Sequence, residues 1–136
     1  MDGTKTMSMY NSLSKEQQMY LYTLIKIISE GSPVNKAKEK VLYEQAKSMP
    51  FNSYEYDLFL QRLDPISLKR ELSSFNDNQK DFAVAMTLEL LTCNGVPSER
   101  DYMVAENAFE KIMGMNSDDF LKRLEKIQSI GKFFSK

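Results

Sequence analysis

The chain has 136 residues, 42% of them hydrophobic, with a formal net charge of −1, one cysteine and no histidine. This length suggests a single domain with enough apolar side chains for a core, and the balanced charge argues against a nucleic-acid partner, which requires a basic face. Without histidine the chain has no Ser–His or Cys–His nucleophile pair, and one cysteine excludes an internal disulfide and a thiolate metal site.

The N-terminal residues contain no long apolar run, so the sequence predicts neither a signal peptide nor membrane insertion. A lone cysteine fits a reducing compartment, and we expect a cytoplasmic protein. Residues 1–13 are polar and are expected to form a disordered tail. A single helical domain is expected over residues 14–130, followed by a C-terminal tail at 131–136.

The first half of this domain, residues 14–63, predicts three helices. Each begins at a side chain that can cap a helix and ends at Gly or Pro. The expected caps are Ser14 (with Gln17 as its capping-box partner), Asn35 and Ser53, and the helices cover residues 15–30, 36–49 and 54–63.

Residues 64–76 are expected to connect the halves through a short helix that follows the N-cap pair Asp64-Pro65. The second half, residues 77–130, begins with the most apolar stretch of the chain, in which Glu89 is the only charged residue between Phe82 and Cys93. A helix that is apolar on all sides is buried, and about a dozen residues are too few to span a bilayer. The boundaries expected in this half are a cap at Asn76 or Asp77, an end at Asn94-Gly95, a helix from Ser98 to Met113, and a last helix from Ser117 to Gly131.

The two halves share a pattern at an offset of 64 residues. The offset pairs Gly31 with Gly95, Pro33 with Pro97, and Asn52-Ser53 with Asn116-Ser117. Each half therefore consists of a buried helix, a Gly-Pro turn, an amphipathic helix, an Asn-Ser cap and a third helix. We predict an all-α protein of about seven helices in two similar three-helix halves, packed about a pseudo-twofold axis with the two buried helices in the centre.

These turns also carry a family resemblance. The apolar helix is followed by Asn94-Gly95-Val96-Pro97-Ser98-Glu99-Arg100-Asp101 and by an amphipathic helix that ends at Ile112-Met113-Gly114-Met115-Asn116-Ser117. Over roughly residues 14–128 this succession resembles the TerB-like family of tellurite-resistance domains. The resemblance implies an all-helical fold in two halves, a role in stress response, and acidic turns that bind divalent metal. The chain departs from the family where the turn Asp is replaced by Asn94, and by Glu30 in the first half.

Acidic residues near the two Gly turns are the candidate metal ligands. Ca²⁺ and Mg²⁺ prefer carboxylate oxygens, and Glu99 with Asp101, or Glu30 with Glu39, would supply them weakly. The alternative is that these acids are solvated residues, some of them at helix starts that the helix dipole favours. No other cofactor is expected.

Phe51 and Tyr54 are the candidate contacts to another protein. Tyr54 and Tyr56 are two residues apart and cannot share one helix face, so Tyr56 is expected inside and Tyr54 outside, where tyrosine is favoured at interfaces. Cys93 is expected to be a buried hydrophobe rather than a reactive thiolate, which needs a nearby cation. The sequence thus predicts a non-enzymatic helical protein-interaction module, and the alternative is a divalent-metal sensor or small metal-dependent enzyme.

Overall fold

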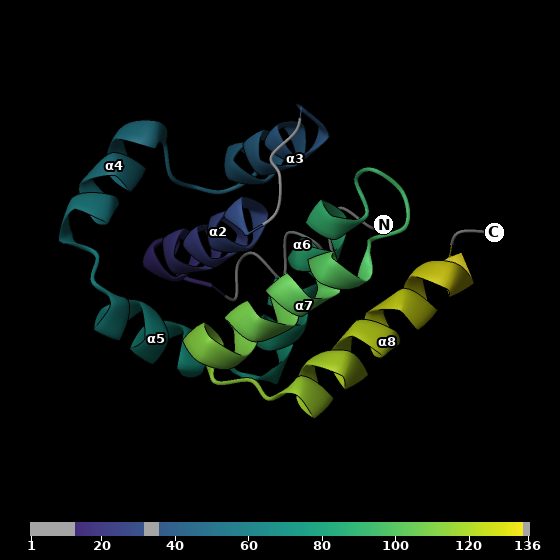
Figure 1. Cartoon of the computed structure of the whole chain (residues 1–136). Helices are drawn as coiled ribbons and strands as arrows, with labels where there is room; N and C mark the ends of the chain where they lie inside the picture. The colour runs from purple at the N-terminus through teal and green to yellow at the C-terminus, as the bar shows by residue number, and fades with distance from the viewer. Residues whose placement is uncertain (1–12, 32–35, 135–136) are drawn as a thin grey trace.

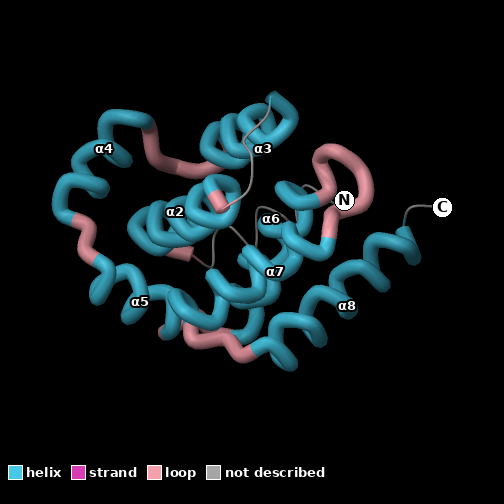
Figure 2. Tube along the Cα trace, viewed as in Figure 1, coloured by secondary structure: helices cyan, strands magenta, loops and turns pink. Residues whose placement is uncertain are grey.

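The computed structural model describes residues 13–31 and 36–134, the last five of them by backbone alone, and every regular element in these ranges is helical. The expected all-α fold is confirmed (Figures 1 and 2). None of the helices in these ranges is long and apolar enough to span a membrane. The elements are α2 (Lys15–Glu30), α3 (Lys36–Lys47), α4 (Ser53–Arg62), α5 (Pro65–Ser73), α6 (Asp77–Leu91), α7 (Glu99–Ala108), the π-helical turn η1 (Phe109–Met113) and α8 (Ser117–Phe134).

The core is built on α2 and α6, which pack against each other. Both helices bury side chains on more than one face, as the apolar stretch of α6 predicts; Glu89 is exposed there while Val84, Thr87 and Leu90 are fully buried. The remaining faces are closed by α3 and α7, each of which packs against both central helices. Figure 1 shows α4 and α5 at one side of this centre and α8 at the other.

The short helix expected as a connector is part of the core. Helix α5 packs against η1 and α2, and it buries Leu68 and Leu72. Its start was predicted correctly, because Asp64 Oδ1 accepts the Ser67 amide at 2.8 Å and Pro65 is the first helical residue. Residues 64–76 therefore supply apolar packing as well as a link.

Local capping rules predict most helix starts and miss two by one residue. The capping boxes Ser14–Gln17 and Ser98–Asp101 are present, and Asn76 caps α6. At α4 and α8 the cap is Asn52 or Asn116 instead of the predicted serine, since each asparagine side chain accepts the backbone amide three residues on at 2.8 Å. The hydroxyl of Ser117 donates instead to Glu106 on α7.

Several expected helix ends and the expected start of the domain differ from the structure; α3, for example, ends at Lys47 rather than at residue 49. Helix α6 ends at Leu91, before the predicted Asn94-Gly95, and α8 continues through Gly131 to Phe134. A single glycine inside a helix costs only about 1 kcal/mol relative to alanine. This cost is too small to end a long helix. Leu13 is buried and belongs to the domain rather than to the tail. Residues 1–12, the predicted cap at Asn35 and residues 135–136 lie outside the described ranges.

The paired glycines Gly31 and Gly95 are required for different reasons. Gly95 has φ of 104°, in the left-handed region, and has open space around it. Gly31 has an ordinary φ of −74°, but a Cβ there would lie 2.4 Å from Val104 Cγ1 on α7. Gly31 therefore permits the close approach of α2 and α7.

We expect Gly31→Ala to destabilise the protein by about 1–2 kcal/mol through this overlap. In a Val104→Ala background the overlap is removed, and Gly31→Ala is expected to be neutral or to stabilise by up to about 1 kcal/mol, because alanine restricts the unfolded chain. Urea denaturation of the four proteins of this cycle measures both effects. An equal loss in the two backgrounds would contradict the close-approach explanation.

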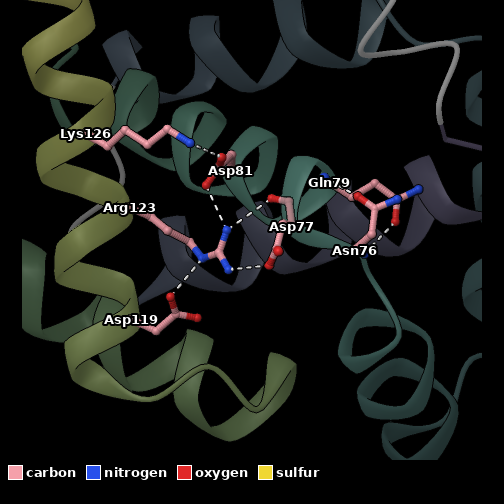
Figure 3. A network of polar contacts seen from close by, with 7 residues as sticks. All are labelled: Asn76, Asp77, Gln79, Asp81, Asp119, Arg123 and Lys126. Atoms are coloured by element: carbon pink, nitrogen blue, oxygen red, sulfur yellow. Dashed lines mark hydrogen bonds and ion pairs between the residues drawn. The ribbon is translucent and has the colours of Figure 1, made fainter.

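A cluster of charges attaches α8 to α6 (Figure 3). Arg123 lies 2.9 Å from Asp77, 2.8 Å from Asp81 and 3.1 Å from Asp119, and Lys126 lies 2.9 Å from the other Asp81 oxygen. The side chains of Arg123 and Asp81 are only 13% and 15% exposed. Burial alone would raise the pKa of Asp81, but the hydrogen bonds from Lys126 and Arg123 outweigh it and hold the pKa below its ordinary value.

Asp81→Asn is expected to lower the free energy of unfolding at pH 7 by about 1–3 kcal/mol, because the buried Arg123 loses a carboxylate partner. The folded pKa lies below the unfolded value of about 3.9, so the stabilisation is complete above about pH 5 and is lost as pH falls through the folded pKa. Denaturation at several pH values should show the two proteins converging at acid pH. Asp57→Asn, at an exposed position on α4, is the control and should change little at either pH.

Candidate binding site

The structure does not collect the four candidate metal ligands into one cluster. Within the described ranges, no three Asp, Glu or Cys side chains are grouped as a metal site requires. Glu30, Glu39 and Glu99 are exposed. Asp101 accepts the Ser98 amide at 3.0 Å, so its carboxylate serves the α7 capping box. Asp101 is therefore explained by the alternative to metal binding, in which the acid stabilises the start of a helix.

The two candidate partner contacts have different environments. Tyr54 is 70% exposed and Tyr56 is buried, as the two-residue spacing predicts. Phe51 does not protrude as an anchor, because the chain between α3 and α4 folds its ring onto Tyr56 with centroids 5.5 Å apart. Cys93 is half-buried in the turn after α6, less covered than expected.

Phe51 forms one wall of a groove between α2, α3 and the start of α4. The groove has a volume of about 350 Å³. Four aromatic side chains line it, together with two cations; these are Tyr22, Tyr43, Phe51 and Tyr56, with Lys26 and Lys47. Three of the rings form one cluster, since the Tyr22 centroid lies 5.8 Å from that of Phe51 and 5.3 Å from that of Tyr56. The fourth, Tyr43, is 66% exposed.

Hydrogen bonds fix two of these tyrosines. The Tyr22 hydroxyl donates to the Leu42 carbonyl at 3.3 Å and so joins α2 to α3. The Tyr56 hydroxyl lies 2.8 Å from the hydroxyl of Thr23 on α2. Helix α4 is also held by Phe59, whose ring meets that of Tyr20 edge-on at 4.8 Å, and by the ion pair Lys15–Glu55 at 2.7 Å.

Two cations, Lys26 and Lys47, lie among the residues that line the groove. The Lys26 amine lies 5.4 Å from the centroid of the Tyr56 ring, within the range of a cation–π contact. Burial raises the pKa of Tyr56 to about 12, with a smaller opposing effect of the Thr23 hydrogen bond, and burial also raises the pKa of Tyr22. Both phenols stay neutral at physiological pH, and no Asp or Glu is among the residues that line the groove.

Sequence reasoning found Phe51 and missed the rest of the groove. Tyr22 and Lys26 lie on a helix whose apolar residues predict only burial, and Tyr43 and Lys47 lie on a helix rich in charge. The spacing of Tyr22 and Lys26, and of Tyr43 and Lys47, is four residues, which places each pair on one helix face. This repeated aromatic–lysine pair is the signal that would have indicated the groove.

Comparison of the chain with protein-family models, with curated proteins and with solved structures finds no match.

Proposed function

We propose that this protein is a non-enzymatic protein-interaction module of the TerB-like kind, which binds an acidic segment of another protein in the groove between α2, α3 and α4. The observation that carries the proposal is the combination of clustered aromatic rings with two lysines and no lining acid. Aromatic side chains supply most of the energy at many protein interfaces. The lysines favour a negatively charged partner segment, because like charges brought together at an interface are costly.

Tyr54 extends this surface. It follows Ser53, which lines the groove, and at 70% exposure its ring is available to a segment that continues past the start of α4. Tyr43 is exposed on the α3 side of the same groove. A partner segment lying in the groove would thus meet buried rings on its floor and an accessible tyrosine on α3, with Tyr54 beside the groove on α4.

We also propose that the two halves descend from one three-helix unit, as the TerB-like resemblance implies. The offset of 64 residues pairs Thr23 with Thr87, and both are buried with a hydroxyl that donates to the carbonyl four residues earlier. It also pairs the caps Asn52 and Asn116. The central packing is reciprocal, since α3 of the first half packs against α6 and α7 of the second packs against α2.

Tyr54→Ala is expected to weaken partner binding by about 1–2 kcal/mol, the loss typical of an interface hot spot. Its exposure predicts an unchanged melting temperature, so lost affinity would not reflect unfolding. The probe is an acidic peptide selected on the immobilised protein from a random display library, and fluorescence anisotropy measures its dissociation constant. If the variant bound the peptide with full affinity, Tyr54 would not be part of the interface.

Reversing the two groove charges tests the proposed site itself. Lys26→Glu with Lys47→Glu is expected to weaken the acidic peptide at least about tenfold, because attraction becomes repulsion. The matched control is Lys36→Glu with Lys40→Glu, two exposed lysines of α3 that do not line the groove. Equal losses of affinity in both double variants would show that the peptide is attracted nonspecifically by charge. Separately, turnover of a substrate by the purified protein would overturn the non-enzymatic assignment.

A further inference from the structure

A second hollow lies at the other end of α4 and has a different character. It is a cavity of about 530 Å³ lined by residues of α2, the turn between α4 and α5, α5 and η1. Its apolar walls come from Ile27, Leu63, Leu68 and Ile112, and two cations, Lys69 and Lys111, lie among them. Small-molecule sites have this size and composition: mostly apolar, with a few polar groups that fix the ligand.

The cavity exists because α4 stops early. Helix α4 has 10 residues and ends where Asp64-Pro65 turns the chain into α5, whereas α8 continues for 18 residues. Leu91, near the end of α6, is 6% exposed, but Ile27, near the end of α2, is 36% exposed. An apolar side chain is thus left facing a hollow beside the break.

The π-helical turn η1 supplies another part of the wall. It places Lys111 and Ile112 in the lining of the cavity and is followed by Gly114, whose φ of 75° lets the chain turn sharply. Turns of this kind are rare inside helices and occur frequently at functional sites. The same element that packs against α5 therefore also provides one of the two cations.

The other polar groups of the cavity are already engaged. The Thr23 hydroxyl donates to the Met19 carbonyl at 2.8 Å and lies 2.8 Å from the Tyr56 hydroxyl. Asp64 accepts the Ser67 amide at 2.8 Å and the Ser67 hydroxyl at 3.0 Å. Among the ion pairs of the described residues, none involves Lys69 or Lys111. The two lysines are the cations that can recognise an anionic ligand, and they outnumber the one carboxylate in the lining, Asp64.

We propose that this cavity binds an amphipathic organic anion, an alkyl carboxylate of the fatty-acid type. The alkyl chain lies against Ile27, Leu68 and Ile112, and the carboxylate pairs with Lys69 and Lys111. Hydrogen bonds between an ammonium and a carboxylate are about twice as strong as neutral ones, so the charged end orients the chain. The site is separate from the aromatic groove, and neither proposal depends on the other.

The test is an NMR titration of the methyl-labelled full chain with decanoate, below the concentration at which it forms micelles. We expect saturating shifts of the Ile27, Leu68 and Ile112 methyl signals. Lys69→Gln with Lys111→Gln should raise the dissociation constant at least about tenfold, the effect of losing a charge-assisted contact. Decanol, which has the same chain without the charge, should bind more weakly than decanoate by a similar factor.

Two further variants make the outcome specific. Ile27→Phe adds bulk inside the cavity at a partly exposed position and is expected to weaken decanoate while the protein stays folded. Lys36→Gln with Lys40→Gln removes two exposed lysines elsewhere and should leave binding unchanged. Absence of saturable shifts, shifts confined to other residues, or equal affinity for decanol and decanoate would each overturn the proposal.

Discussion

The packing of α2 against α6 is the constraint on which the rest of the structure depends. From Phe82 to its end, helix α6 has almost no polar face, and burial of each large aliphatic side chain contributes about 1.5–3 kcal/mol. One neighbouring helix cannot cover a helix on several sides. The fold meets this requirement by placing α3 and α7 across both central helices. Gly31 belongs to the same solution, because the contact of α2 with α7 leaves no space for a Cβ there.

Helices α4 and α8 are attached to the centre by different forces. Helix α8 packs closely against α6 with Phe120 and Leu124 buried, and the nearly buried Arg123 holds it in register. Helix α4 contributes two buried side chains, Tyr56 and Phe59, to its contact with α2. These two aromatic rings attach α4 near its middle, and a hollow lies at each end of the helix. The groove and the cavity both lie where α2 is incompletely covered, at Tyr22, Lys26 and Ile27.

Much of the fold could be predicted from the sequence because its signals are local. Capping boxes such as Ser14–Gln17 act over three residues, and the apolar run of α6 leaves burial as the only stable outcome. The errors arise where neighbours compete or distant residues decide. Asn52 and Ser53 are both good caps, and only the observed geometry separates them. Most residues of the groove and the cavity could not be predicted, because each hollow combines residues of several elements whose mutual placement no local pattern encodes.

The two hollows are separated by one hydrogen-bonded pair. Tyr56 lines the groove, Thr23 lines the cavity, and their hydroxyl oxygens are 2.8 Å apart. Both hydroxyl groups are neutral at physiological pH, and burial raises the pKa of Tyr56 further, to about 12. The cations on each side are Lys26 and Lys47 in the groove, and Lys69 and Lys111 in the cavity. In the cavity the carboxylate of Asp64 offsets one of the two positive charges. At physiological salt, exposed charges are screened over roughly 8 Å, so charge alone would bind an acid weakly at either place. Selectivity must come from what surrounds the cations: aromatic rings suit the side chains of a peptide, and an aliphatic hollow suits an alkyl chain.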